Sequence, residues 1–552
     1  MYRCAGCAWM TRTGGNNMNK INNSVLVLAI IALLCGTASA ATTIYVGPGE
    51  ANAMIQGAVN NATSGDTIIV RDGPYNENVN VGVTHLTIQS ENGSANCFVN
   101  ASDPDDHVFN VSMFGNYTNI SGFTIRDATG DGAAGIYLGL GVDYCNIADN
   151  IVSNSDVGIS TYHSNNNTIT DNTVNSNDCG VRMEMSRDNT LQNNIVNSNE
   201  GDGIYLSMFS DDNVFTNNTA NLNDCGIHLH QSNDNAFTDN IANSNDGNGI
   251  YLSLWSSNNT FTDNTVNSND CGVRMEMSRD NTLQNNIVNS NEGDGIYLSM
   301  FSDDNVFTNN TANLNDCGIH LHQSNDNAFT DNIANSNDGN GTYLSLGCSN
   351  NTFTNNTANS NDCGIRLRQS NNNTFTKNTV SSNDYGIRLY QSNNNSITCN
   401  GVCNNAQRGL HLFLFSRDNS ISYNNIIANG DCNATTGGWE WQFVNDQSND
   451  VEARHNYWGA GMNNTTIDAS LHDDDEGILG EVKFYPFETE PVTCAPTHEE
   501  TPAFTTTDAA IALQIAVGNR EYGSRWDVNS DGRVTSLDAL MILQAATGNG
   551  SL

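Results

Sequence analysis

Apolar and polar residues alternate over short stretches along most of the chain, with clusters of Asn, Asp, Gly and Ser between the stretches. Ile250 and Leu252 are apolar with a polar-tipped residue between them, and Phe261 and Val266 follow after polar turns. An alternation with a period of two predicts β-strands, and the spacing leaves no room for helices between them. The pattern therefore predicts an all-β fold of short strands.

The pattern repeats with a period of about 23 residues. A glycine opens most units, in the phrase Gly-Ile/Val-x-Leu/Met, and recurs every 22 or 23 residues at Gly135, Gly158, Gly180, Gly203, Gly226, Gly249, Gly272, Gly295, Gly318, Gly341, Gly364, Gly386 and Gly409. An asparagine three residues after an apolar residue forms a second register at Asn150, Asn172, Asn194, Asn218, Asn240, Asn264, Asn286, Asn310, Asn332, Asn356, Asn378, Asn400 and Asn424. Residues 170–249 recur unchanged as 262–341, a shift of 92. Units of this kind bury their apolar face only by stacking on their neighbours.

A unit of this length holds about three short strands, and a stack of such units is a parallel β-helix. The small apolar set of each coil then joins a continuous core. The repeated asparagine predicts a ladder in which each side-chain amide bonds the next coil. The signature of leucine-rich repeats is absent.

The phrase G-I-x-L-x-x-S-x-x-N-T-F/I-x-x-N resembles the repeat of the NosD-like, carbohydrate-binding and sugar-hydrolase (CASH) group of pectin-lyase-like right-handed β-helices. The resemblance implies an all-β, right-handed parallel β-helix over residues 41–487, with its most regular repeats at 130–425. Residues 43–77 resemble the N-terminal cap of that group, in which a short helix, here about 51–61, covers the end of the core. Asn456-Tyr457-Trp458-Gly459 resembles the phrase of a late coil.

The chain is acidic because it has few basic residues. Its 552 residues include 60 Asp and Glu but only 20 Lys and Arg, a formal net charge of −40. This balance excludes a basic nucleic-acid footprint and disfavours binding to anionic lipids.

The N-terminal segment predicts export. An eleven-residue apolar run, Val25 to Cys35, follows Lys20 and precedes an Ala38-Ser39-Ala40 cleavage site. This is the pattern of a secretory signal within residues 1–40, with Met18 as an alternative start. The run is too short to favour a membrane span, and no second run of spanning length follows. We therefore expect a secreted, extracellular or envelope-associated protein without a transmembrane anchor after cleavage.

The cysteines of the repeat are spaced too widely to pair. Cys179, Cys225, Cys271, Cys317 and Cys363 lie 46 residues, or two coils, apart. Two coils separate Cα atoms by about 9.6 Å, whereas a disulfide needs them within about 7 Å. The spacing thus predicts free thiols and argues against a disulfide-stapled fold.

Residues 488–503 contain Pro491, Pro496 and Pro502 without apolar periodicity, which predicts a linker. Residues 504–552 form a second module. Its D-x-N-x-D-G loop has the spacing of an EF-hand calcium loop, with oxygen ligands expected from Asp527, Asn529, Asp531, Arg533 (carbonyl), Thr535 and Asp538.

The module resembles a type I dockerin, which pairs two calcium loops with two helices. The segments 507–514 and 537–544 match each other, at an offset of 30, but Thr497, Glu499, Thr501 and Pro502 stand where the first loop needs its ligands and glycine. The resemblance therefore implies a small α-helical, dockerin-like calcium module with one Ca²⁺ site and a possible cohesin-like protein partner.

On the β-helix, the outward position two residues after each glycine forms a file of rings and planar cations, which we call the first file: Tyr137, Ser160, Arg182, Tyr205, His228, Tyr251, Arg274, Tyr297, His320, Tyr343, Arg366, Arg388 and His411. Two positions further on, a second file contains Tyr162, Glu184, His230, Glu276, His322, Arg368 and Tyr390, and Phe209, Trp255 and Phe301 lie next to these. Such a row suits stacking on sugar rings and hydrogen bonding to hydroxyls or carboxylates. An alternative is that strand faces favour aromatic residues and that duplication copied them.

We expect glycan binding at Tyr205, His228, Tyr251, Arg274, Tyr297, His320, Tyr343 and Arg366. The paired Asp and Gly-His-Gly motifs of polygalacturonase-like β-helices are absent, so no catalytic residue is assigned. The NosD resemblance suggests copper as a bound metal, for which methionine sulfur is a suitable ligand. The candidate methionines fall on the inward side and suit the core: Met183, Met185, Met275 and Met277. The His228–His230 pair is a weaker metal candidate.

Three interpretations follow. The favoured one is a non-catalytic protein that binds polysaccharide or a cell-surface glycan. The alternatives are a polysaccharide lyase, hydrolase or epimerase, and a purely structural surface-layer component.

Overall fold

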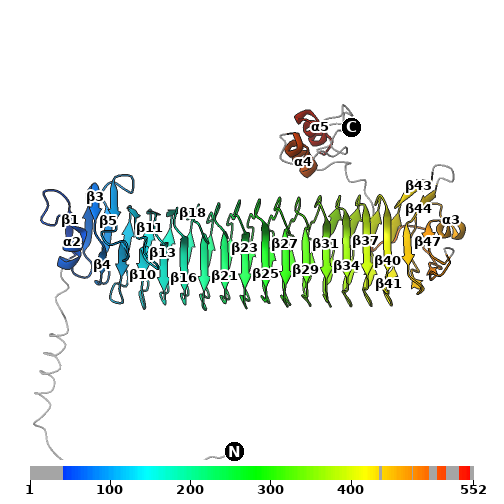
Figure 1. Cartoon of the computed structure of the whole chain (residues 1–552), viewed down its shortest axis with the longest axis horizontal. Coiled ribbons are helices and arrows are strands. Elements are labelled where there is room, and N and C mark those ends of the chain that lie inside the picture. The colour runs from blue at the N-terminus through cyan, green and yellow to red at the C-terminus, as the bar shows by residue number, and fades with distance from the viewer. Residues whose placement is uncertain (1–40, 434–437, 475–476, 497–505, 517–533, 547–552) are drawn as a thin grey trace, which may run out of the picture.

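The computed structural model describes residues 41–433, 438–474, 477–496, 506–516 and 534–546. Coils of short strands stack along the long axis of the molecule (Figure 1) and form three parallel sheets, as the repeat predicts. Within the described ranges, no helix combines the length and apolar character that crossing a membrane requires.

Sheet A is 17-stranded. Its strands are β1 (Thr43–Val46), β2 (Thr67–Val70), β5 (Thr87–Ser90), β8 (Asn119–Ser121), β11 (Asn146–Ala148), β14 (Thr168–Thr170), β17 (Thr190–Gln192), β20 (Val214–Thr216), β22 (Ala236–Thr238), β24 (Thr260–Thr262), β26 (Thr282–Gln284), β28 (Val306–Thr308), β30 (Ala328–Thr330), β32 (Thr352–Thr354), β35 (Thr374–Thr376), β38 (Ser396–Thr398) and β41 (Ser420–Ser422).

Sheet B has the fewest strands of the three sheets. Its strands are β3 (Gly73–Asn76), β6 (Cys97–Asn100), β9 (Thr124–Arg126), β12 (Ile151–Ser153), β15 (Thr173–Asn175), β18 (Ile195–Asn197), β33 (Thr357–Asn359), β36 (Thr379–Ser381), β39 (Gly401–Cys403) and β42 (Asn425–Ile427). Single parallel bridges from Ile195 to Thr357 continue the sheet between β18 and β33.

Sheet C presents the outward files. Its strands are β4 (Val79–Val81), β7 (Phe109–Val111), β10 (Ala134–Leu138), β13 (Val157–Tyr162), β16 (Cys179–Glu184), β19 (Ile204–Ser207), β21 (Ile227–His230), β23 (Asn248–Ser253), β25 (Cys271–Glu276), β27 (Ile296–Ser299), β29 (Ile319–His322), β31 (Asn340–Ser345), β34 (Cys363–Arg368), β37 (Tyr385–Tyr390), β40 (Arg408–Phe413), β45 (Phe443–Asp446) and β47 (Leu471–His472). After β42 the chain adds an antiparallel hairpin, β43 (Asp431–Asn433) with β44 (Gly438–Glu440), and a parallel pair, β46 (Val451–Glu452) with β48 (Val482–Lys483).

The core is a set of stacked files of like residues. Phe215, Phe237 and Phe261 stack at 4.4 and 4.7 Å between ring centroids, and Leu283 separates this stack from the next one, which begins at Phe307. These rings are buried, so each coil contributes a small apolar set to one continuous core.

The predicted asparagine column is a buried ladder, and two further ladders accompany it. In the predicted one, Asn172 donates its backbone N–H (3.1 Å) and its Nδ2 (3.1 Å) to Oδ1 of Asn194 in the next coil. The second begins at Asn167 and the third at Asn177, each running through successive coils in the same way. The sequence therefore predicted one of these three buried ladders.

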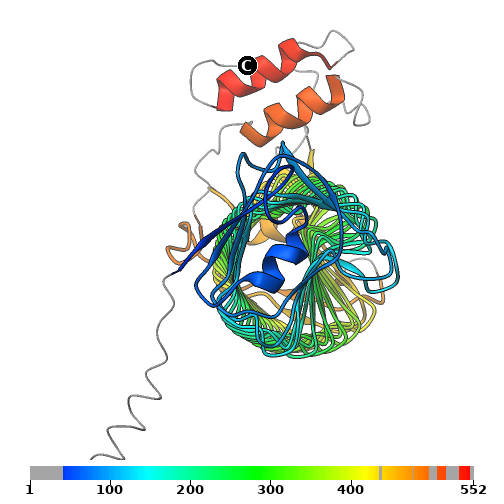
Figure 2. The ribbon, with the colours of Figure 1, turned by 90° about the vertical axis from the view of Figure 1, so that its left-hand side faces the viewer.

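Helix α2 (Ile55–Asn61) lies across the open N-terminal end of the coil, as Figure 2 shows. It starts at Ile55 rather than near residue 51, because the carboxylate of Glu77 accepts hydrogen bonds from the N–H groups of Ile55 (2.8 Å) and Gln56 (2.9 Å). A carboxylate at this end satisfies otherwise unpaired N–H groups and is favoured by the helix dipole.

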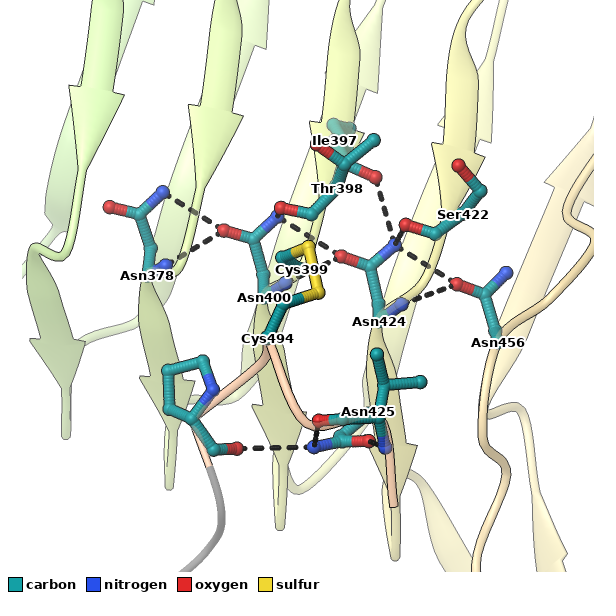
Figure 3. Close-up of a disulfide and its surroundings, with 12 residues drawn as sticks. Asn378, Ile397, Thr398, Cys399, Asn400, Ser422, Asn424, Asn425, Asn456 and Cys494 are labelled. Atoms are coloured by element: carbon teal, nitrogen blue, oxygen red, sulfur yellow. Dashed lines mark hydrogen bonds between the residues drawn. A yellow bond between two sulfur atoms is a disulfide. The ribbon is translucent and has the colours of Figure 1, made fainter. Parts of the chain in front are cut away.

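A disulfide joins Cys399 to Cys494, a pair that the argument from the repeat spacing did not consider. Figure 3 shows it beside the ladder of Asn378, Asn400, Asn424 and Asn456. The predicted spacing argument holds for the five cysteines of the repeat, which are free thiols. The argument does not apply to Cys494, because this cysteine lies outside the repeat.

The same contact corrects part of the predicted linker. Asn425 accepts a hydrogen bond from the N–H of Val492 (2.8 Å) and donates to the carbonyl of Pro496 (3.2 Å), so residues 492–496 are fastened to sheet B. The expected leader, residues 1–40, lies outside the described residues.

Helices α3 (Asn464–Asp468), α4 (Thr506–Ala516) and α5 (Ser536–Ala546) complete the described elements. Ile511, Ile515 and Ile542 are buried between α4 and α5, whereas Leu513, Leu540 and Leu543 are 40 to 50% exposed. These leucines lie on the outer sides of the helix pair and not in its core.

Candidate functional site

The first file is continuous on the outer face of sheet C. Strand pairing places each of its residues directly beside the next, from Tyr137 and Ser160 at one end to Arg388 and His411 at the other. Neighbouring strands are about 4.8 Å apart, so the side chains stack.

The eight predicted glycan-binding residues form one uninterrupted stack. Ring centroids lie 5.0 Å apart for Tyr205 and His228 and 4.7 Å apart for His228 and Tyr251. The Arg274 guanidinium carbon lies 5.5 Å from the Tyr251 ring and 5.7 Å from that of Tyr297. The stack continues through His320, Tyr343 and Arg366 with distances of 5.0, 4.7 and 5.2 Å.

Hydrogen bonds fix the rings of this face. His228 Nδ1 lies 3.0 Å from Asp202 Oδ2, and His228 Nε2 lies 3.2 Å from Ser253 Oγ. The Tyr251 hydroxyl donates to Glu276 Oε2 at 2.7 Å, and burial followed by this bond raises the pKa of Tyr251 to about 12. The tyrosine is therefore neutral at physiological pH, and the face is ordered before any ligand binds.

A row of exposed aromatic residues borders the face. Phe209, Trp255 and Phe301 follow β19, β23 and β27 and are 56, 62 and 56% exposed. Their φ angles of 68, 70 and 67° are in the left-handed region, which is unfavourable for bulky residues. Phe415, after β40, repeats this geometry with a φ of 69° and 55% exposure. We call these four residues the aromatic rim.

Left-handed φ angles recur at the turns of most coils, so exposed rings and not the backbone distinguish the rim. The rim residues 209, 255 and 301 are two coils apart, so their rings recur about every 9.6 Å beside the first file. Three members of the rim follow from the sequence spacing of 46 residues, whereas Phe415 does not share this spacing.

The last coils contain a cluster that has no copy elsewhere in the described chain. The Asp446 carboxylate lies 2.7 Å from Nε2 of His411 and 3.3 Å from Nε2 of His472. Arg408 lies 3.0 Å from the His411 ring nitrogens, and its guanidinium carbon is 5.1 Å from the Trp441 ring.

Burial first, and then the Arg408 charge, lower the pKa of His411, whereas its bond to Asp446 acts in the opposite direction. His411 is therefore neutral at physiological pH. Sequence reasoning placed His411 in the first file but missed Asp446 and His472, because both follow the last regular repeat.

On the β-helix, the candidate metal ligands are an Asp–Asp–Cys group, which occurs twice, and the predicted methionines. Asp202, Asp224 and Cys225 bring their ligand atoms within 4.8 Å of one another, and the duplicated unit repeats this arrangement. Burial raises the pKa of Cys225 to about 11. Met183 and Met275 are buried in the core as expected, but Met185 and Met277 are only half-buried, in turns with φ near 50°.

Of the predicted calcium ligands, Asp527, Asn529, Asp531 and Arg533 lie outside the described residues. Asp538 is buried, and its Oδ2 accepts hydrogen bonds from the N–H (2.9 Å) and hydroxyl (2.8 Å) of Thr535 at the start of α5.

Two family models match parts of the chain. Residues 108–266 match a model described as a right handed beta helix region. The chain has the fold of a right-handed β-helix. Residues 241–313 and 300–463 match a model described as periplasmic copper-binding protein (NosD). No curated protein matches the chain.

Several solved structures are similar to this β-helix. The A-module of the mannuronan C-5 epimerase AlgE4 of Azotobacter vinelandii is 13% identical, covers 67% of this chain and 94% of its own, and gives a TM-score of 0.39. The alginate lyase AlyF-OU02, in complex with G6, is 13% identical over 67 and 87% of the two chains, with a TM-score of 0.37. DFA-IIIase from Arthrobacter chlorophenolicus A6 is 12% identical over 52 and 83%, with a TM-score of 0.36. At these TM-scores the similarities say nothing about the activity of this chain.

Proposed function

We propose that this chain is an extracytoplasmic protein that binds a polysaccharide along the outer face of sheet C. The main support is the uninterrupted stack of eight rings and planar cations. Aromatic faces stack on sugar rings, and guanidinium and imidazole groups donate hydrogen bonds to hydroxyls and carboxylates. A repeating ligand contacts repeating sites, so many weak contacts add up through avidity.

The aromatic rim supports the same function. Its four rings are exposed, and three of them, Phe209, Trp255 and Phe301, are regularly spaced along the edge of the face. The disulfide between Cys399 and Cys494 supports an extracytoplasmic location, because such bonds persist in oxidising compartments.

Replacement of Tyr205, Tyr251, Tyr297 and Tyr343 with Ala tests the function. The variant should bind oligosaccharides found in a glycan screen at least about tenfold more weakly, because four stacking surfaces are lost. Tyr423→Asn is the matched control, because Tyr423 is 46% exposed at a turn after sheet A and not on this face. An unchanged affinity in a variant that melts like the wild type would exclude the face.

The alternative function, a polysaccharide lyase, hydrolase or epimerase, is favoured by the Asp446 cluster. A carboxylate held by two histidines beside an arginine is a possible acid–base group, and unlike the stack it occurs at one place. New reducing ends or unsaturated uronate absorbance that disappear in Asp446→Asn would support it. Absence of both binding and turnover would favour a structural surface-layer component.

We further propose that residues 504–552 tether the β-helix through one Ca²⁺ site in the dockerin-like loop. Asp538 would supply the ligand at loop position 12, next to the hydrogen bonds that it receives from Thr535. The exposed Leu513 and Leu540 offer an apolar surface to a cohesin-like protein partner.

A further inference from the structure

Arginines of the face have internal counter-ions in the duplicated coils. The Arg182 guanidinium lies 3.7 Å from Glu184 Oε2, and Arg274 lies 3.6 Å from Glu276 Oε2. In each case the glutamate stands two residues after the arginine, in the second file. In the sequence Arg-x-Glu, the glutamate carboxylate therefore neutralises the charge of the arginine.

The phrase changes in β34, where Arg368 stands in the place of the glutamate after Arg366. The next strand places Arg388 directly beside Arg366. Three guanidinium groups thus gather on one part of the face. No carboxylate among the described residues lies within the 4.0 Å of an ion pair with any of them, and their guanidinium groups donate no hydrogen bond to the described residues.

This arrangement is unusual in a chain with 60 acidic residues and only 20 basic ones. The nearest acids influence the cluster only at longer range. Burial first, and then Asp384, raise the pKa of Asp362, while Arg388 and Arg366 lower it. Like charges at neighbouring positions repel each other, so the cluster is stabilised when an anion joins it.

The surroundings of the cluster suit a sugar. Arg366, Arg368, Arg388, Tyr390 and Phe413 line a surface cavity of about 240 Å³. The guanidinium carbon of Arg388 lies 4.9 Å from the Phe413 ring, and that of Arg366 lies 5.2 Å from the Tyr343 ring. The stack of the first file leads into this cavity through Tyr343.

We infer that this cavity is an anion subsite, which takes the carboxylate of a uronate residue or a sulfate ester of the bound glycan. The inference rests on the proposed function, because it places the glycan on the sheet C face. Arginine suits both groups, since its planar fork donates two parallel hydrogen bonds to a carboxylate or sulfate. The glycan is then an anionic one, anchored at the C-terminal part of the face.

The decisive variant is Arg368→Glu, which restores the Arg-x-Glu phrase. The chain already folds with this phrase at residues 182–184 and 274–276, so the variant should fold like the wild type. Lys377→Asp is the matched control, because it changes the charge equally at an exposed turn after β35, where the neighbouring coils also carry polar residues.

Titration calorimetry on the full chain would use four probes: a galacturonate hexasaccharide, its neutral methyl ester, a sulfated galactose hexasaccharide, and inorganic sulfate. The wild type should prefer one of the two charged saccharides over the neutral ester. Arg368→Glu should weaken binding of that saccharide at least about tenfold and leave the ester within about twofold. Lys377→Asp should leave both unchanged.

The outcomes separate the two proposals. Equal affinity for charged and neutral saccharides, or an unchanged affinity in Arg368→Glu, overturns the anion subsite while the glycan-binding function stands. Inorganic sulfate that binds as tightly as the saccharides overturns the assignment of a glycan to this cavity. A wild type that binds no saccharide overturns the proposed function itself.

Discussion

Each ladder asparagine uses its whole side-chain amide to bond to neighbouring coils. Oδ1 of Asn264 accepts from the N–H (2.9 Å) and Nδ2 (3.1 Å) of Asn240, and Nδ2 of Asn264 donates to Phe237 O (3.1 Å) and Asn286 Oδ1 (3.0 Å). The side chain is buried, so water cannot replace any of these bonds. An unsatisfied buried polar group costs about 1–3 kcal/mol.

Asn264→Ala should therefore lower the free energy of unfolding by about 2–5 kcal/mol, because four partner groups lose their bonds together. Urea unfolding followed by circular dichroism measures this change. Asn258→Gly is the control: Asn258 is exposed in the same coil, and its φ of 57° is one that glycine adopts freely. Similar losses in both variants would contradict a special role for the ladder.

A second residue-scale prediction concerns His411. Burial lowers its pKa in the folded state, so as pH falls the unfolded chain takes up a proton first. The stability that depends on neutral His411 is complete above the ordinary histidine pKa of about 6.5 and declines as the pH falls below it. The thermal midpoint of the wild type should fall from pH 7 to pH 5.

His411→Gln should reduce this fall, because glutamine does not titrate. The half-buried His455, whose Nδ1 lies 3.1 Å from Glu488 Oε1, changed to Gln, is the comparison variant and should retain the fall, because it keeps His411. A profile in His411→Gln that matches the wild type would show that other groups cause the acid sensitivity.

At the scale of elements, the recurring glycine marks the closest approach between coils. A Cβ at Gly249 would lie 2.2 Å from Val266 Cγ1 and 2.9 Å from the Gly272 carbonyl oxygen. The position is tight because the strand enters sheet C against the valine of sheet B and the backbone of the next coil. The glycine thus allows tight stacking rather than a special backbone turn.

Gly249→Ala should destabilise the β-helix by about 1–3 kcal/mol, because the clash involves backbone as well as a packed side chain. Thermal unfolding of the variant measures it. Gly57→Ala in helix α2 is a matched control, since a Cβ there meets nothing closer than 3.7 Å and alanine favours a helix. Equal melting of Gly249→Ala and the wild type would contradict this account.

The sequence predicted those elements that repeat. Strand alternation, the glycine column, one asparagine ladder and the order of the first file followed from periodicity, because each feature occurs in many coils. The other two ladders were hidden, since Asn is common throughout the repeat and only burial distinguishes ladder residues from turn residues. The start of α2 depends on Glu77 from a later coil, which no local signal reveals.

Features that occur only once could not be predicted from the periodicity of the sequence. Cys494 lies 95 residues from Cys399, outside the repeat, so no spacing argument connects the two. Asp446 and His472 meet His411 only because the last, irregular coils return to sheet C. The candidate site was therefore predictable as a stack, but not in its C-terminal cluster.

At the scale of the whole molecule, the C-terminal part of the chain consists of a segment that is bonded to the β-helix and a small helical module that follows it. The disulfide and the Asn425 hydrogen bonds fasten residues 492–496 to the β-helix. Beyond them, α4 and α5 pack around Ile511, Ile515 and Ile542, and the other buried apolar residues of this cluster, among those that the structure describes, are three alanines and Val534. So small a module needs a further source of stability, such as a bound metal ion.

The last prediction is that Ca²⁺ supplies this stability. The sequence places Asp527, Asp531 and Asp538 within twelve residues, and a divalent ion that binds them would convert the repulsion among their carboxylates into coordination at about 2.3–2.6 Å per oxygen. Folding and binding then form one equilibrium. Calorimetry on the full chain should detect one Ca²⁺ site that Asp527→Ala with Asp531→Ala removes. Chelator should speed proteolysis after residue 496 but leave the β-helix intact. Calcium binding that survives both substitutions, or a tail equally resistant in chelator, would show that the loop is not a calcium site.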